Sequence, residues 1–145
     1  MRNASWLLVV SFFFLLDQFT KLLALSFAPP CVQQAGVFCL IFNSGAAFGI
    51  LSGFNTVLLL LSILASLILL YALHTVSSRF DKWGASFVLA GVLGNGLDRV
   101  LHGAVVDFIR IGSWPVFNVA DMCIVCGVCL LLLQNSSSKS SKSSK

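Results

Sequence analysis

Four long apolar segments dominate the pattern of hydrophobic and polar positions along the chain. They span about residues 6–27, 54–73, 83–101 and 114–134. Each is long enough to cross the hydrocarbon core of a bilayer as a helix, which takes about 20 residues. The pattern therefore predicts an all-α integral membrane protein with four transmembrane helices, built as one membrane-embedded domain over residues 1–135.

The segment 28–53, between the first and second predicted spans, has a different pattern. Residues 31–42 mix β-branched, aromatic and glycine residues, which is typical of short strands, and the sequence QQAG at 33–36 fits a turn. We therefore expect a small β-rich outer subdomain here. Cys31 and Cys39 flank the turn, but the sequence leaves open whether they form a disulfide, because it does not give the distance between their Cα atoms.

The composition also indicates a membrane protein. Of the 145 residues, 58% are hydrophobic and 10% are charged, and the mean hydropathy is +0.98. A soluble domain carries about 25% charged residues, so this class is excluded. The net charge is +4, but the basic residues are too scattered for a nucleic-acid-binding stripe, and no nucleic-acid partner is expected. Residues 136–145 contain only Ser and Lys, which predicts a disordered tail.

Basic residues near the ends of the spans predict the orientation of the chain, because Lys and Arg accumulate on the cytoplasmic side of a membrane. Arg2, the loop between the second and third spans, and the tail carry basic charge on one side of a four-span arrangement, whereas Arg110 stands alone in the loops of the other side. Both termini are therefore expected in the cytoplasm. The first span could be read as a secretory signal, but Asp17 and Lys21 interrupt its apolar run, so we interpret it as a retained helix.

Four of the five acidic residues lie in or beside the predicted spans, namely Asp17, Asp98, Asp107 and Asp121. Ionisable groups are costly at such depths, so they are candidate functional residues by default. In the predicted topology all four lie toward the outer side of the membrane. Asp17 and Lys21 are four residues apart and share a helix face, which predicts a buried ion pair with a structural role.

Two Asn–Asp pairs repeat one spacing near the outer side. Asn95 with Asp98, and Asn118 with Asp121, are each three residues apart and so share a helix face. One interpretation is that both pairs face a common site. The alternative is that each Asn caps a helix or forms an interhelical hydrogen bond, and the sequence leaves both open.

Asp107 stands among apolar neighbours, with Val106 before it and Phe108 after it. Desolvation penalises the charged form of a carboxyl, so we expect a raised pKa for Asp107. If Asp107 lies near Asp121, the two like charges share one proton, as in an aspartic-protease dyad. The carboxylate then takes a proton from an attacking water, and the carboxylic acid protonates the oxyanion or the leaving amine.

Other catalytic or metal sites have weaker support. His74 and His102 fall on opposite sides of the predicted membrane, so they cannot build one site. Cys123, Cys126 and Cys129 recur at every third position, but they lie inside a span, where Cys behaves as a small hydrophobe. Neither a metal site nor a cofactor is expected.

Five short motifs, in order along the chain, resemble those of the lipoprotein signal peptidases, also called signal peptidase II. They are DQFTK at 17–21, NSGAAF at 43–48, Gly91 followed by GNGLDR at 94–99, VVDF at 105–108 and FNVAD at 117–121. The resemblance implies an aspartic endopeptidase of the bacterial inner membrane that removes the signal peptide from diacylglyceryl-modified prolipoproteins, cutting before the lipidated Cys. It also implies a periplasmic β-rich subdomain with a lid-like segment, and an active site that faces the periplasmic side.

The resemblance also assigns roles to individual residues of this sequence. It makes Asp107 and Asp121 the catalytic residues, and it makes Asn43, Asn95 and Arg99 the substrate-binding residues. The residues expected to support the site are Asp17, Lys21, Gly45, Ala47, Phe48, Asp98, Val105, Asn118 and Ala120.

The sequence departs from the family pattern in the short stretch 107–121 and in Met122, where a small hydroxyl residue is common. The expected partners are the diacylglyceryl-modified prolipoprotein substrate and membrane lipids, and the expected state is a monomer. The alternative function is a small membrane transport or proton-relay subunit, which also gathers carboxylates. A relay needs carboxylates at successive depths across both leaflets, whereas here they lie at one depth.

Overall fold

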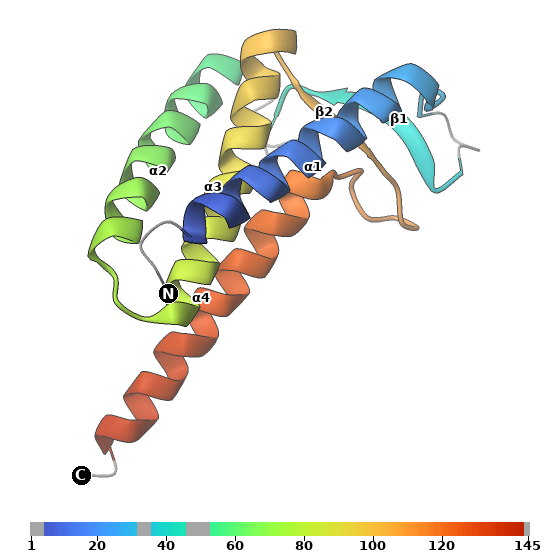
Figure 1. Cartoon of the computed structure of the whole chain (residues 1–145). Helices are drawn as coiled ribbons and strands as arrows, with labels where there is room; N and C mark the ends of the chain where they lie inside the picture. The colour runs from blue at the N-terminus through green and yellow to red at the C-terminus, as the bar shows by residue number, and fades with distance from the viewer. Residues whose placement is uncertain (1–4, 32–35, 46–52, 144–145) are drawn as a thin grey trace.

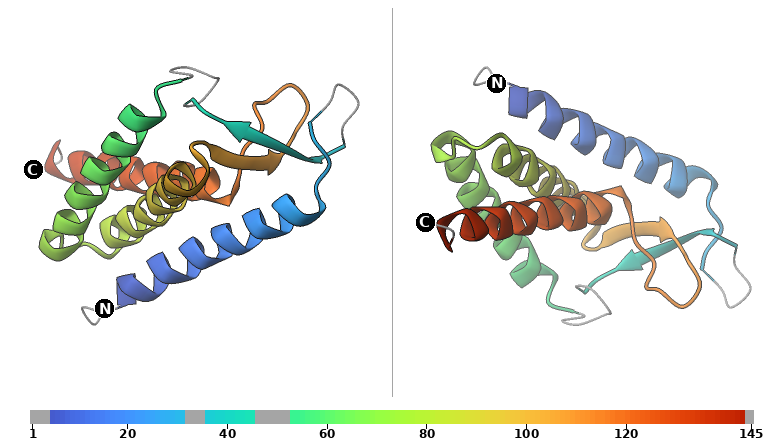
Figure 2. Two further views of the ribbon diagram at one scale, coloured as in Figure 1. Left: turned by 90° about the horizontal axis from the view of Figure 1, so that it is seen from above. Right: turned by 90° about the horizontal axis from the view of Figure 1, so that it is seen from below.

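The computed structural model describes residues 5–31, 36–45 and 53–143. In this part of the chain it contains four helices and two strands. In chain order these are α1 (Ser5–Phe27), β1 (Phe38–Asn43), α2 (Asn55–Thr75), α3 (Arg79–His102), β2 (Val105–Ile109) and α4 (Val119–Ser143). The helices form a bundle with the strands at one end, and α1 begins and α4 ends at the other (Figures 1 and 2). The predicted, mostly helical fold with a small β-rich part is therefore confirmed.

Helix α3 lies at the centre of the bundle and contacts each of the other three helices. Its glycines allow close approach: a Cβ atom on Gly91 would overlap the carbonyl oxygen of Ala120, and one on Gly94 would lie 2.5 Å from Oδ2 of Asp17. The helix is followed by Gly103, whose φ of 70° is favourable for glycine. This sharp end turns the chain directly into β2.

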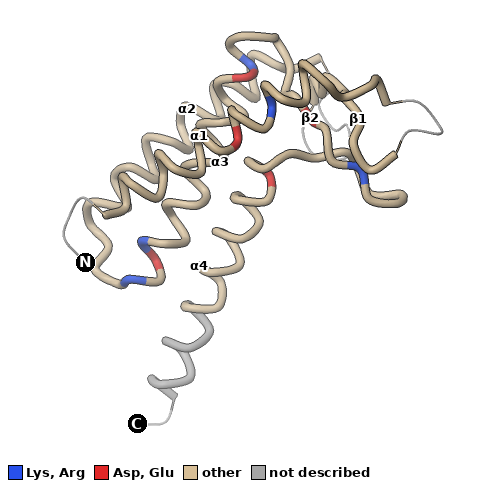
Figure 3. The backbone as a smooth tube through the Cα atoms, turned by 45° about the vertical axis from the view of Figure 1, so that its right-hand side comes forward, with Lys and Arg blue, Asp and Glu red and all other residues tan. Residues whose placement is uncertain are grey.

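Among the described residues, two helices are long and apolar enough to cross a membrane, α1 with 23 residues and α2 with 21. Many of their large apolar side chains are exposed, as expected of surfaces that face lipid tails. The apolar part of α4, Val119–Gln134, is shorter, and α3 carries charged residues near both of its ends. Charged positions gather at the turn between α2 and α3 and around the strand end of the bundle (Figure 3).

Strands β1 and β2 form a two-stranded antiparallel sheet in which Ile41 is opposite Asp107 and Asn43 is opposite Val105. A strand is therefore present in the expected segment, but its partner, β2, lies outside that segment, among residues that the sequence pattern places in a loop. Local composition indicates a strand, whereas its partner depends on tertiary packing. Residues 33–35 of the expected turn lie outside the described residues.

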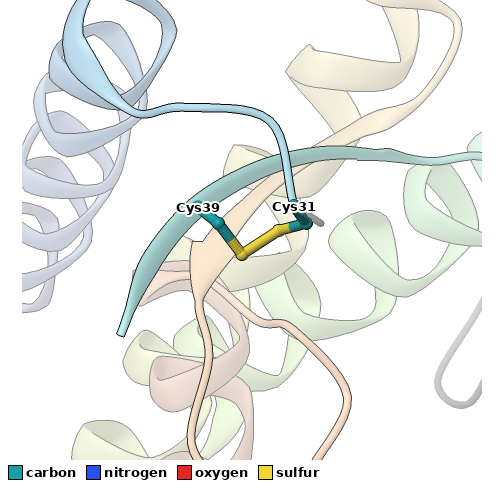
Figure 4. Close-up of a disulfide and its surroundings, with 2 residues drawn as sticks. All are labelled: Cys31 and Cys39. Atoms are coloured by element: carbon teal, nitrogen blue, oxygen red, sulfur yellow. A yellow bond between two sulfur atoms is a disulfide. The ribbon is translucent and has the colours of Figure 1, made fainter. Parts of the chain in front are cut away.

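A disulfide joins Cys31 to Cys39, which answers the question that the sequence leaves open (Figure 4). The bond links the segment after α1 to β1. The backbone of the same segment is also bonded to the strand: the N–H of Cys31 donates to the carbonyl of Leu40 at 3.0 Å, and the N–H of Leu40 donates to the carbonyl of Pro29 at 2.7 Å. The sheet is thus attached to α1 both covalently and by hydrogen bonds.

Helix α4 differs from the predicted fourth span at both ends. It begins at Val119 rather than at 114, because Phe117 forms an antiparallel bridge with Ile109 and Pro115 disfavours a helix interior. At its other end the helix continues to Ser143, through part of the tail that the composition predicts to be disordered. Ser and Lys can extend a helix that already exists, because no new nucleation is needed.

Candidate active site

Three charged side chains from α1 and α3 form a buried cluster at the strand end of the bundle. Nζ of Lys21 lies 2.8 Å from Oδ2 of Asp17 and 2.8 Å from Oδ2 of Asp98, and none of the three side chains is more than 2% exposed. The predicted ion pair between Asp17 and Lys21 is confirmed. Asp98 is a further partner, which spacing within one helix does not reveal.

The carboxylates of this ion cluster also bind the backbone of other elements. Asp17 accepts a hydrogen bond from the N–H of Ala120 in α4 at 2.8 Å, and Asp98 accepts one from the N–H of Val106 in β2 at 3.0 Å. Nε2 of Gln18 lies within donor distance of both carboxylates, at 3.1 and 3.3 Å. The cluster therefore fixes α1, α3, β2 and α4 relative to one another. Gln18 is not among the predicted site residues, although it stands in the DQFTK motif.

Asn118 has two roles at the start of α4. It caps the helix, because its Oδ1 accepts the N–H of Asp121 at 2.9 Å while its own N–H donates to Oδ2 of Asp121 at 3.2 Å, the reciprocal pattern of a capping box. Its Nδ2 also donates to Oδ1 of Asp107 at 2.7 Å and to Oδ1 of Asn95 at 3.0 Å. Both interpretations that the sequence leaves open hold for this residue.

Asn95 connects the ion cluster to Asp121. Its Oδ1 accepts a hydrogen bond from Nζ of Lys21 at 3.0 Å, and its Nδ2 donates to Oδ1 of Asp121 at 2.8 Å. The second contact crosses from α3 to α4. The two asparagines therefore reach a common group of carboxyls, as one interpretation of their repeated spacing predicts.

Asp107 and Asp121 line one cavity of about 330 Å³. Asp107 lies on β2 and is 1% exposed, and Asp121 lies in the first turn of α4. The expected substrate-binding residues Asn43, Asn95 and Arg99 line the same cavity. Its other walls come from Gly45, Val105, Trp114, Pro115, Val116, Phe117, Ile124 and Val125. The structure thus brings together the residues to which the resemblance gives catalytic and binding roles.

Both carboxyl oxygens of Asp107 accept hydrogen bonds from amides. Nδ2 of Asn43 lies 2.9 Å from Oδ2, and Nδ2 of Asn118 lies 2.7 Å from Oδ1. Burial, and then the negative charge of Asp121, raise the pKa of Asp107 from 3.8 to about 7, against the opposing effects of Asn43, Lys21 and Asn118. The raised pKa expected from its apolar neighbours is confirmed. A carboxyl with this pKa can hold or release a proton at neutral pH.

Arg99 holds the chain that follows β1. Its Nη2 donates to the carbonyl of Gly45 at 3.1 Å, and its Nη1 donates to the carbonyl of Asn95 at 3.2 Å. The guanidinium therefore connects the end of β1 to α3 at the edge of the cavity. Of the expected supporting residues, Ala47 and Phe48 lie outside the described residues.

One wall of the cavity is not predicted from the sequence. Residues 114–117 form it, whereas the hydrophobic pattern places them in the fourth span. Pro115 is the signal that could locate the start of the helix after them, because proline removes a helix-forming N–H.

Comparisons with known proteins give a consistent result. The family model described as signal peptidase II matches residues 9–136. The lipoprotein signal peptidase of Caldicellulosiruptor bescii is 39% identical over 127 residues, which cover 85% of this chain and 84% of the relative. That of Halothermothrix orenii is 36% identical over 126 residues, covering 83% of this chain and 87% of the relative. A solved bacterial membrane enzyme superposes with a TM-score of 0.86 at 31% identity, over 96% of this chain and 92% of that chain.

Proposed function

Because the chain belongs to the signal peptidase II family, whose members remove signal peptides from prolipoproteins, we propose that Asp107 and Asp121 are the residues with which it cuts its substrate. The family is one of aspartic-type proteases. The observation that supports this choice is that two carboxyls from different elements line one cavity, and that the pKa of Asp107 is about 7. Such a pair can hold one carboxylate and one carboxylic acid at neutral pH, which is the state the reaction requires.

In the proposed mechanism, the charged member of the pair takes a proton from a water as that water attacks the scissile carbonyl carbon. The protonated member gives its proton to the developing oxyanion or to the leaving amine. Asn43 and Asn118 orient the carboxyl of Asp107, and Asn95 orients that of Asp121. Because these donors are neutral amides, they fix the geometry without the full positive charge that would hold both carboxyls ionised.

We assign the binding of the substrate backbone to Asn43, Asn95 and Arg99, which line the cavity beside the pair. The ion cluster of Asp17, Lys21 and Asp98 fixes the helices α1, α3 and α4 and the strand β2 relative to one another. The diacylglyceryl group stays among the lipid tails and presents the bond before the lipidated Cys to the catalytic pair. Anchoring in lipid supplies an orientation that a free peptide lacks.

The proposed placement is a monomer in the inner membrane, with one domain over residues 1–135, four spans, both termini in the cytoplasm and the cavity toward the periplasm. Supporting it, the strands lie at the end of the bundle opposite to the start of α1 and the end of α4 (Figure 2). The disulfide lies at this strand end, and disulfides persist in oxidising compartments. The exposed apolar side chains of α1 and α2 would contact membrane lipids.

The substrate requirement is tested with purified enzyme in detergent and two forms of one prolipoprotein, with and without the diacylglyceryl group. Cleavage is followed as a size shift. We expect the modified form to be cut and the unmodified form to be cut at least about a hundredfold more slowly, because orientation by the anchor is lost. Comparable turnover of the two forms would contradict the lipid requirement, and no turnover of either would contradict the proposed function.

The topology is tested by labelling single thiols in intact cells. Ser113 is exposed after β2, and Ser77 is exposed between α2 and α3. In a background whose α4 cysteines are replaced by Ser, a membrane-impermeant thiol reagent should label Ser113→Cys and spare Ser77→Cys. The opposite labelling would overturn the proposed orientation.

A further inference from the structure

Strand β1 carries Asn43 to the proposed catalytic pair, but its pairing with β2 is incomplete. The two strands form a two-stranded sheet, and an isolated sheet of this size is only marginally stable. The register of β1 against β2 is also irregular between Phe38 and Ile41. Additional anchors are therefore needed to keep Asn43 in one position.

The disulfide attaches β1 within this irregular stretch. Cys39 lies inside it, is fully buried, and is bonded to Cys31 in the segment after α1 (Figure 4). The two backbone hydrogen bonds between Leu40 and residues 29–31 lie beside the bond. Where β1 pairs irregularly with β2, it is instead fixed to the end of α1.

Asn43 is held from its other side as well. Its Oδ1 accepts the N–H of Gly45 at 3.0 Å, and the carbonyl of Gly45 accepts a hydrogen bond from Arg99 at 3.1 Å. Its Nδ2 is thereby free to donate to Asp107 at 2.9 Å. Because side chains alternate between the faces of a strand, a slip of β1 by one residue would turn Asn43 away from Asp107.

We propose that the Cys31–Cys39 disulfide is a positioning element of the active site, which holds β1 in the register that places Asn43 against Asp107. This inference rests on the proposed catalytic role of Asp107. The bond touches neither the substrate nor the reacting atoms and acts only through Asn43. Its sequence separation is 8, and a loop this short restricts the unfolded chain less than a long one does, so its main effect is expected on local geometry.

Loss of the disulfide should change the pKa of Asp107 in a defined direction. Asp107 would lose the donor from Asn43, one of the groups that lower its pKa, while Asp121, Lys21, Asp98 and Arg99 remain around it. The pKa of Asp107 would then rise further. The pH profile of kcat should move to higher pH by about one unit, which is the size expected for the loss of one hydrogen bond to a carboxylate.

The test compares the double variant Cys31→Ser/Cys39→Ser with a matched control, Cys126→Ser/Cys129→Ser, which removes two exposed thiols of α4. Cleavage of the diacylglyceryl-modified precursor is measured across pH, with helical content checked by circular dichroism. We expect kcat to fall about tenfold in the first variant, with a smaller change in KM and the stated shift of the profile, and neither change in the control. An unchanged kcat and pH profile in the first variant would overturn the inference.

A second arm uses folded wild-type enzyme, so that the result does not depend on how the variant folds. Dithiothreitol converts the disulfide to two thiols and is itself oxidised to a cyclic disulfide. It should lower kcat in the wild type and in the α4 control, but not in Cys31→Ser/Cys39→Ser. If the loss of activity instead followed a loss of helical content, the bond would be merely structural and the inference would be wrong.

Two further variants separate this inference from the proposed function. In an Asn43→Ala background, removing the disulfide should add little, because both changes act through one contact. Additive losses would overturn the inference. Asp107→Asn should be inactive with or without the bond, and an active Asp107→Asn would overturn the proposed function instead.

Discussion

The strand end of the bundle contains two groups of acidic side chains that are stabilised in different ways. In the ion cluster, Asp17 and Asp98 share Nζ of Lys21 at 2.8 Å each. Asp107 and Asp121, the catalytic pair proposed here, accept their hydrogen bonds from neutral amide side chains and, for Asp121, from a backbone N–H as well. The two groups are adjacent, since Asn95 bonds to both Lys21 and Asp121.

This difference separates two uses of a carboxyl at the same end of the protein. A carboxylate paired with a buried ammonium holds elements together, and losing either partner leaves an unpaired buried charge. A carboxyl that has neutral donors and a second carboxyl nearby can exchange a proton near neutral pH. Asp17, Asp98 and Asp107 are all buried, so direct contact with the Lys21 ammonium is what distinguishes the two groups.

The largest expected effect is on the stability of the ion cluster. Lys21→Met leaves Asp17 and Asp98 without their cation and should cost about 3–5 kcal/mol of stability, seen as loss of folded protein in detergent. Because Lys21 serves two carboxylates, Asp17→Asn in the Lys21→Met background should recover only part of the yield. Adding Asp98→Asn should recover more.

The control for this series is the set of single variants. If the losses from Lys21→Met and Asp17→Asn were strictly additive, the interaction energy between the two residues would be zero. The contact between them would then contribute nothing to stability. Full recovery by Asp17→Asn alone would show that Asp98 is not a partner of Lys21.

The next effect is a relative gain in stability at higher pH when the charge of Asp107 is removed. Its pKa is about 7 in the folded protein and about 3.8 without the fold, so the folded state holds a proton between these values that the unfolded state releases. This contribution is complete below about pH 4 and is lost as the pH rises through 7. The stability of Asp107→Asn relative to the wild type should therefore increase by about 1–3 kcal/mol between pH 5 and pH 8.

Thermal unfolding at pH 5 and pH 8 measures this difference, which should be larger at pH 8. Asp81→Asn is the matched control, because Asp81 lies in the first turn of α3, where a negative charge is favourable. The control should show no gain at pH 8. A difference between Asp107→Asn and the wild type that did not grow with pH would contradict the raised pKa.

The smallest effect distinguishes the two roles of Asn118. Asn118→Ala should lower stability by about 1 kcal/mol through loss of the helix cap, and lower kcat about tenfold through loss of the amide donor to Asp107. Asn118→Ser keeps a side-chain oxygen for the N–H of Asp121 but has no amide donor. It should therefore restore stability and leave kcat low. Restoration of both would show that Asn118 only caps α4.

Interactions within one element could be predicted from the sequence, whereas most of those between elements could not. The spacing of Asp17 and Lys21 is enough to predict their ion pair, because residues four apart meet on a helix. Asp98 joins them from another helix, and no local pattern encodes that contact. The strand β1 likewise follows from its composition, whereas its pairing with β2 depends on the turn at Gly103 that follows α3.

The candidate active site was likewise predictable only where the effect is local in sequence. The apolar neighbours of Asp107 are enough to predict its raised pKa, because desolvation is a local effect. The wall formed by residues 114–117 could not be predicted from hydrophobicity, since an apolar cavity wall and a membrane span have the same composition. Substrate-binding roles for Asn43 and Arg99 are indicated only by the motif resemblance, and both residues line the same cavity as the proposed catalytic pair.

The most direct test of the contrast between the two groups is to measure kcat per folded enzyme in three variants. Asp107→Asn and Asp121→Asn change the proposed catalytic pair, and Asp98→Asn changes the ion cluster. The first two should each fall by at least about a thousandfold with folded protein retained, because an amide can neither take a proton from water nor supply one. Their double variant should be no worse than either single variant, since the two residues act as a unit. Asp98→Asn should instead lose folded protein while the remaining enzyme still turns over. Near-normal turnover by well-folded Asp107→Asn would contradict the account and leave Asp98 as the leading partner of Asp121.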